Sequence, residues 1–213
     1  MCKLSTKAMS PDQAVDIRSQ GMRSKLLSLH TIHTILYNHA TVFISPHATI
    51  KSSSADEPTS FVQATKQWLC LSLSRNGASS TQRVFEVSCE IFWLMVAHLR
   101  VMLKKEIEVF LKEIYFAILD KRAAPTFQKH YILGIFGRLA QDSRALVEVY
   151  LNYDCDRTAL DNMFQHTVEH LSRFASTPVI VTAVQQQAYQ ERKPAVPDWQ
   201  HKSSLPPLSL IHI

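Results

Sequence analysis

The chain has 213 residues, of which 46% are hydrophobic and 19% charged, so most of it is expected to fold as one domain or two small ones. Its formal charge is +5, from 23 basic and 18 acidic residues that are mixed along the sequence. No basic stripe interleaved with aromatic residues occurs, which argues against a nucleic-acid-binding protein. Only 4 glycines are present. Because glycine serves tight turns and strand corners, its scarcity favours helices with short connections over a β-sandwich or barrel.

The cysteines and the apolar runs indicate a cytosolic or nuclear compartment. Four cysteines lie far apart without CxxC spacing: Cys2, Cys70, Cys89 and Cys155. The longest unbroken apolar run, residues 91–97, is far shorter than the ~20 residues that a membrane span needs. The polar residues after Met1 do not form a signal peptide. The sequence therefore predicts a soluble protein whose membrane contact would be peripheral.

The first two helices are predicted from apolar residues that recur every three or four positions. One covers residues 22–40, and a polar loop follows over residues 48–58. The second helix begins at Pro58 and is closed by Asn76 and Gly77 in the manner of a helix C-cap.

A long apolar stretch, residues 84–122, contains neither Gly nor Pro. The Ser-Ser-Thr run at 79–81 is suited to cap its start. One straight helix there would be ~58 Å long, which is too long for an isolated element of an ordinary domain. A sharp turn is therefore predicted near residues 100–104 on length alone. In the second half, Glu108 and Lys112 are four residues apart and are expected to form an ion pair on the helix surface.

Three further helices are predicted over residues 126–142, 144–151 and 157–175. The first of them contains Gly134 and Gly137. Glycine inside a helix costs ~1 kcal/mol relative to alanine, so a close approach of a neighbouring helix is expected at these two positions.

The end of the chain has a different composition from the body. Five of the nine prolines and a Gln-Gln-Gln run fall within residues 176–213, which predicts a disordered linker without helical period. Residues 1–175 are then an all-α domain of about seven helices and no predicted strand. Helix pairs of ~35–45 residues favour an α-solenoid of armadillo or HEAT type, with a compact helical bundle as the alternative.

Metal sites are poorly supported. The connection between the last two helices reads NYDCD, residues 152–156, in which Asp154 and Asp156 alternate as at the start of an EF-hand loop. The glycine and the closing glutamate of such a loop are missing, although Ca²⁺ needs ~6–8 oxygen ligands. His30 and His33 have the spacing of a zinc pair, but no Cys or acidic partner lies near them in the sequence. The sequence predicts no metal and no cofactor.

Enzymatic chemistry is not indicated either. A thiol nucleophile at Cys155 would need a histidine, for which His166 and His170 on the next helix are candidates. The carboxylates on both sides of Cys155 in the sequence are expected to disfavour the reactive thiolate. No Walker loop, GxGxxG or GxSxG motif occurs.

The NYDCD residues fit a corner that joins two helices. Asn152 tolerates the αL conformation of a helix C-terminus. Asp156, or alternatively Asp154, can accept the free N–H groups at the start of the next helix. Tyr153 and Cys155 alternate with the polar residues and are expected to turn inward. One carboxylate suffices for the cap, so the other is free to bind a neighbouring helix or an arginine.

NYDCD, within ALVEVYLNYDCDRTALDNMFQHTVEHLSRFAS, resembles the signature box of large Golgi guanine-nucleotide exchange factors for Arf GTPases, of the Sec-seven/BIG type. The similar part of that family is its region of homology upstream of the catalytic domain. The similarity extends back through IEVFLKEIY and KQWLCLSLSRN to RSKLLSLHTIHTIL and covers about residues 2–176. The later TPVIVTAVQQQAYQE is similar to the linker of fungal members.

The resemblance implies an armadillo-like array between an N-terminal dimerisation and cyclophilin-binding domain and the catalytic domain. It implies regulation by packing against that upstream domain. It also implies cytoplasmic recruitment to the trans-Golgi membrane, helped by small GTPases of the Arf, Arl or Rab type. The residues that match the box are Asn152, Tyr153, Asp154, Cys155 and Asp156. Asp154 is expected to be the carboxylate that helps to dock the upstream domain.

The chain contains no catalytic domain and no glutamate-finger segment, so a fragment or truncated product without exchange activity is expected. The alternative is a generic helical-repeat scaffold unrelated to Arf traffic. A partner-specific patch far from residues 150–157 would favour that alternative.

Overall fold

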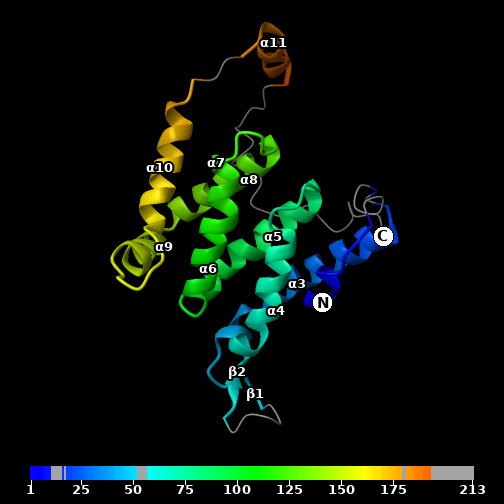
Figure 1. Cartoon of the computed structure of the whole chain (residues 1–213), viewed down its shortest axis with the longest axis vertical. Helices are drawn as coiled ribbons and strands as arrows, with labels where there is room; N and C mark the ends of the chain where they lie inside the picture. The colour runs from blue at the N-terminus through cyan, green and yellow to red at the C-terminus, as the bar shows by residue number, and fades with distance from the viewer. Residues whose placement is uncertain (11–15, 17, 52–56, 179–180, 193–213) are drawn as a thin grey trace.

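The computed structural model describes residues 1–10, 16, 18–51, 57–178 and 181–192, and it is mainly helical (Figure 1). The α-helices are α1 Cys2–Ser5, α3 Gln20–Ile44, α4 Phe61–Asn76, α5 Gln82–Leu94, α6 Lys104–Phe110, α7 Ala117–Asp120, α8 Thr126–Gln141, α9 Ser143–Val149, α10 Met163–Ser176 and α11 Ala183–Arg192. Three π-helical segments extend α5, α6 and α9: η1 Met95–Leu99, η2 Leu111–Phe116 and η3 Tyr150–Asp154. The described strands are β1 Thr49–Ile50 and β2 Thr59–Ser60.

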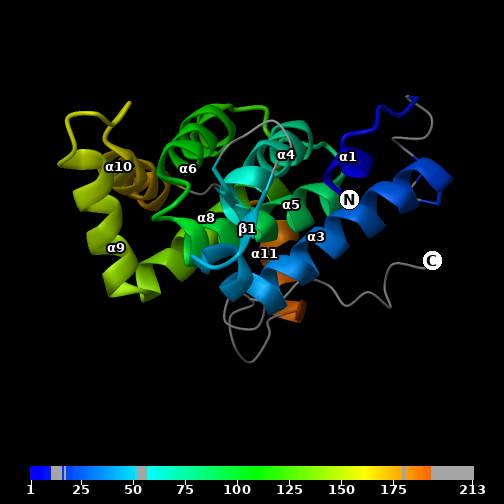
Figure 2. The same cartoon turned by 90° about the horizontal axis from the view of Figure 1, so that it is seen from below.

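The helices pack on one another in series, from one side of the body to the other, broadly in the order of the sequence. α3 packs on α5, α5 on α8, α8 on α9, and η3 with α9 on α10. Figures 1 and 2 agree in placing α1 and α3 at one end and α9 and α10 at the other. This serial packing confirms the predicted all-α, solenoid-like fold and disfavours the compact bundle.

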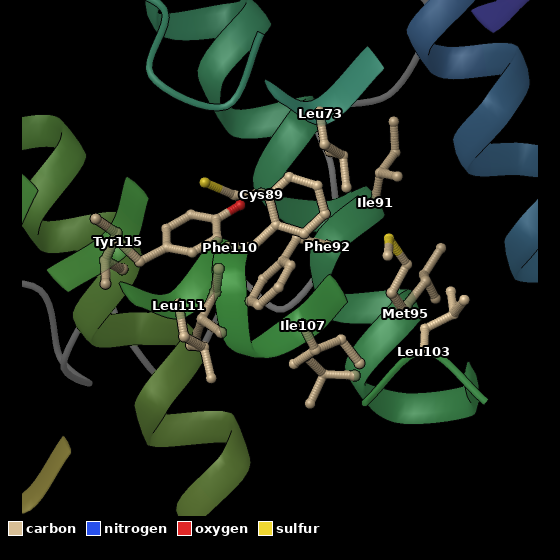
Figure 3. Packing of buried hydrophobic residues seen from close by; sticks show 14 of the residues in the cluster. Leu73, Cys89, Ile91, Phe92, Met95, Leu103, Ile107, Phe110, Leu111 and Tyr115 are labelled. Atoms are coloured by element: carbon tan, nitrogen blue, oxygen red, sulfur yellow. The ribbon is translucent and has the colours of Figure 1, made fainter. Parts of the chain in front are cut away.

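The core lies where α5 faces α6 and η2 (Figure 3). The Phe92 ring lies 4.5 Å from the Tyr115 ring and 6.2 Å from the Phe110 ring, measured between centroids. Phe92 and Cys89 are fully or almost fully buried, so Cys89 serves here as a small apolar group. These contacts form because the chain reverses between Leu99 and Lys104, as predicted from length.

A short pair of antiparallel strands lies at the two ends of the predicted polar loop, where coil alone was expected. Thr49 pairs with Ser60 and Ile50 with Thr59 in antiparallel register. Because residues 59 and 60 take part in this ladder, the second helix begins at Phe61 and not at Pro58. The expectation that the chain has no strand was therefore wrong for these four residues.

Gly77 closes α4 as predicted, whereas the interpretation of the two α8 glycines was wrong. The Gly77 N–H donates to the Leu73 carbonyl at 2.6 Å. Gly134 and Gly137 lie on the exposed face of α8, and a Cβ added at either position would meet nothing within 4 Å. No neighbouring helix among the described residues approaches α8 there.

The last elements depart from the sequence pattern at their boundaries. The predicted helix over 157–175 begins only at Met163, since residues 155–162 form an irregular connection. α11 lies inside the segment that was predicted to lack helix, and its described side chains, 183–191, are exposed. Residues 193–213, the rest of the predicted linker, lie outside the described residues.

Candidate functional site

The corner, residues 150–162, begins as a π-helical continuation of α9. Asp142 starts α9 by accepting the Ala145 N–H at 3.0 Å. The corner's first turn is closed by the Cys155 N–H, which donates to the Tyr150 carbonyl five residues earlier at 3.1 Å. Asn152 lies within this π-turn, and no non-glycine residue that the structure describes has positive φ. The predicted αL cap at Asn152 was therefore wrong. π-turns of this kind are frequent at functional sites.

Asp154 caps α10 from ten residues upstream. Its two carboxylate oxygens accept the backbone N–H groups of Phe164 at 2.8 Å and Gln165 at 2.9 Å. The residue at the N-cap position itself, Asn162, makes no side-chain cap bond. A carboxylate at the positive end of the helix dipole also gains favourable electrostatics. Asp154 is thus the capping carboxylate of the two that the sequence proposed.

Asp156 is the carboxylate that binds a neighbouring element. One of its oxygens forms an ion pair with the Lys104 ammonium at the start of α6. The other accepts the N–H and the hydroxyl of Thr158 at 2.8 and 2.9 Å. Lys104, followed by Thr158, holds the pKa of Asp156 well below its usual range. Asp156 stays ionised at neutral pH and fixes the corner to α6.

Tyr153 makes the second link to α6. Its side chain is buried, and its hydroxyl donates to the Lys104 carbonyl at 2.9 Å. The Lys104 ammonium also lies 5.7 Å from the centre of the Tyr153 ring. Burial raises the pKa of Tyr153, so its hydroxyl keeps the proton that it donates. Tyr153 turns inward as predicted, whereas Cys155 is exposed and does not.

Glu108 anchors the far part of the corner and was not found from the sequence as a site residue. It is 2% exposed, and its Oε1 accepts the N–H groups of Leu160 at 2.5 Å and Asp161 at 3.1 Å. Lys112 pairs with Asp161 at 3.0 Å and lowers the pKa of that carboxyl to about 2. The predicted Glu108–Lys112 surface pair was wrong, because each side chain binds the corner instead. The feature of the sequence that could have indicated burial of Glu108 is its position on the apolar face of the helix, three residues before the buried Leu111.

Asn152 lines a cavity of about 30 Å³ between α5, α6, α8 and α9. Arg100 also lines it and pairs with Glu148, which accepts from Arg144 at 2.8 Å as well. Most of the other lining side chains, such as Phe136, are apolar. The volume is enough for water but far below the ~300 Å³ of small-molecule sites. The cavity supports packing at the corner and not ligand binding.

The residues proposed for chemistry lie apart or are engaged elsewhere. His166 contacts Asp161 at 3.0 Å, and His170 Nδ1 accepts from the Arg173 guanidinium at 2.8 Å, so neither bonds Cys155 among the described contacts. His30 is buried, and burial, followed by His33 and Arg83, lowers its pKa to about 4.

The structure gives no support to thiol or zinc chemistry. Across the described ranges, no three His, Cys, Asp or Glu side chains gather as a metal site would require. Within the same ranges, no helix has the length and apolar character to cross a bilayer.

The comparisons with known proteins place the corner in context. The family model of the Mon2/Sec7/BIG1-like HUS domain matches residues 1–161, which includes the whole NYDCD box. The chain belongs to this Sec7-like HUS-domain family. The resemblance found from NYDCD and the preceding helices is thereby confirmed, and the match is to the HUS domain and not to a catalytic domain.

Relatives from yeasts and mammals cover most of the chain. The Schizosaccharomyces pombe protein named ADP-ribosylation factor guanine nucleotide-exchange factor sec72 is 44% identical over 173 residues, 81% of this chain and 10% of the relative. The corresponding SEC7 protein of Saccharomyces cerevisiae is 42% identical over 192 residues, 90% of this chain and 9% of its own length. Human brefeldin A-inhibited guanine nucleotide-exchange protein 1 is 37% identical over 175 residues, 82% of this chain and 9% of its length. The chain thus spans about a tenth of each of these relatives.

Proposed function

We propose that the chain is a regulatory, non-catalytic interaction module of an Arf guanine-nucleotide exchange factor in Golgi vesicle transport. The observation that carries this proposal is the HUS-domain match over residues 1–161, together with relatives named as Arf exchange factors. In this proposal residues 1–175 form the armadillo-like regulatory unit and residues 176–213 a linker. The module does not itself release nucleotide.

The partners that we propose are the upstream dimerisation domain and a small GTPase of the Arf, Arl or Rab type at the trans-Golgi membrane. The corner supports a docking role through its rigidity. Asp154 holds α10 through a bond of 2.8 Å, and Tyr153 and Asp156 both hold α6, through a bond of 2.9 Å and an ion pair. Because both Asp154 oxygens are engaged, Asp154 acts on docking by fixing the position of α10.

The test is a binding experiment with the purified chain. We expect it to retain the upstream domain of a Sec7-type protein, or a GTP-loaded GTPase of the three types, without accelerating GDP release from Arf. Asp154→Ala is expected to weaken the association.

The matched control is Glu113→Ala, which removes one exposed carboxylate of η2, outside the corner. Circular dichroism verifies that both variants fold. If Asp154→Ala keeps both fold and association, the box only supports the corner. GDP release by the isolated chain would refute the non-catalytic assignment.

A further inference from the structure

Acidic residues are absent from α1, α3 and α4, the helices that the structure describes at the N-terminal end. α1, α3 and α4 together carry five basic residues: Lys3, Arg23, Lys25, Lys66 and Arg75. The four acidic residues of the first 76 fall between the sequences of these helices: Asp12, Asp16, Asp56 and Glu57. Basic and acidic residues are mixed over the chain as a whole, but they are segregated in these three helices.

The helices α1, α3 and α4 lie side by side (Figure 2), and buried polar side chains join them. The hydroxyls of Ser5 in α1 and Ser72 in α4 lie 2.7 Å apart. The Asn76 amide donates to the Ser5 carbonyl at 3.2 Å and accepts from the Lys25 ammonium of α3 at 3.1 Å. Ser5 and Asn76 are 0% and 1% exposed, so this junction is fixed. The charges of α1, α3 and α4 therefore lie on one end of the molecule.

Exposed apolar side chains lie among these charges. The Lys3 ammonium is 4.3 Å from the centre of the Trp68 ring, and 39% of Trp68 is exposed. Trp68, Leu71 and Arg75 are spaced three and four residues apart and share one face of α4. Leu4, next to Lys3, is 53% exposed. We define the basic surface as Lys3, Leu4, Lys25, Trp68, Leu71 and Arg75.

We propose that the basic surface binds an anionic lipid bilayer. Tryptophan prefers the bilayer interface, and lysine and arginine lay apolar stems along a hydrophobic surface while their charges reach the headgroups. Anionic lipids attract clustered cations, and a few exposed leucines add shallow burial. The surface consists of helix sides, while the described cavity lies elsewhere, beside the corner. This inference names the membrane contact of the proposed function and rests on it.

The first experiment measures cosedimentation of the full chain with phosphatidylcholine vesicles that contain or lack phosphatidylserine. We expect retention on the phosphatidylserine vesicles, little retention on phosphatidylcholine alone, and weaker retention at high salt, because salt screens exposed charges. Equal retention on both kinds of vesicle, or none on either, would overturn the proposal.

A charge-matched pair of variants locates the contact. Lys3→Glu with Arg75→Glu is expected to weaken vesicle binding about tenfold or more, since each cation near an anionic surface contributes measurably. Lys121→Glu with Arg122→Glu alters the net charge equally on the exposed α7–α8 connection and is expected to have a small effect. If both pairs weaken binding to the same extent, only net charge matters and the surface assignment fails.

Two further measurements separate this inference from its alternatives. Leu4→Gln with Leu71→Gln is expected to reduce vesicle binding while the salt dependence remains, with circular dichroism verifying the fold. Retention on immobilised polyglutamate, sensitive to Lys3→Glu and Arg75→Glu, without vesicle binding would assign the surface to an acidic protein and overturn the lipid proposal. GTPase binding in solution without vesicles tests the proposed function independently, so that either can fail while the other holds.

Discussion

The core between α5 and η2 and the corner at residues 150–162 are held by opposite kinds of interaction. The core is apolar, with Phe92 against Tyr115 and Phe110. The corner is held by carboxylates: Asp154 accepts from backbone N–H groups, and Asp156 pairs with Lys104. Apolar periodicity is enough to build the core, whereas the corner depends on single acids placed at single positions. Mutations in the core should therefore lower the stability of the whole domain, whereas mutations in the corner should disturb the structure only locally.

The two regions also differ in their response to pH. The corner, although it is rich in carboxylates, is the less sensitive of the two to mild acid. Lys112 lowers the pKa of Asp161 in the corner to about 2, and Lys104 lowers that of Asp156. These two carboxylates stabilise the fold above about pH 4, and this stabilisation is lost only as the pH falls towards their pKa values in the folded protein. The histidine with the largest acid sensitivity is instead His30, buried in α3, while burial also lowers the pKa of His33 and of His170.

The largest effect is expected in the core. Phe92→Ala should lower the free energy of unfolding by ~3–5 kcal/mol, because it removes a 1% exposed ring and leaves a cavity. Urea unfolding followed by circular dichroism measures the loss. Val109→Ala, at a position that is 43% exposed, is the control and should change stability by less than ~1 kcal/mol. Equal losses would mean that α5 and η2 are not the centre of the core.

The second effect concerns pH. Burial lowers the pKa of His30 from 6.5 to about 4, so the unfolded chain binds the proton more tightly between these values. Stability should therefore fall by roughly 3 kcal/mol as the pH drops from 7 to 4. Unfolding measured across this range should show a shallower slope for His30→Leu. The exposed His39→Leu serves as the control, and an unchanged slope in His30→Leu would contradict the assignment.

The third effect is smaller and local to the corner. Asp154→Ala removes the acceptor of two N–H groups and should cost ~1–2 kcal/mol. Amide hydrogen exchange at Phe164 and Gln165 should accelerate, while amides of α5 keep their protection until global unfolding. Asp154→Asn keeps one side-chain carbonyl oxygen as an acceptor and should therefore lose less stability than Asp154→Ala. Acceleration spread evenly over all helices would mean that the corner and the core unfold as one unit.

The features that could be predicted from the sequence belong mostly to the core, and those that could not belong mostly to the corner. The helices and the turn near residues 100–104 were predictable, since apolar spacing and helix length depend on neighbours in the chain. The sequence left two candidates for the helix cap, Asp156 and Asp154, and the structure shows that Asp154 is the cap. The bond from Glu108 to Leu160 was not predictable, because it joins residues 52 apart: the place of Glu108 on the apolar face indicates burial but not the partner. The acid-free composition of α1, α3 and α4 was visible in the sequence, but its meaning required the contact that joins these helices.

The smallest predicted effect tests where the core ends. Because an added Cβ at Gly134 or Gly137 meets nothing within 4 Å, alanine there only removes the entropic cost of glycine in a helix. Gly134→Ala should therefore raise the free energy of unfolding by ~0.5–1 kcal/mol, measured by urea unfolding. Gly77→Ala is the matched control and should destabilise, because its Cβ would lie 2.8 Å from the Leu73 carbonyl oxygen. Destabilisation by Gly134→Ala would show that another helix packs on this face of α8 in solution, and the core would then extend beyond the described body.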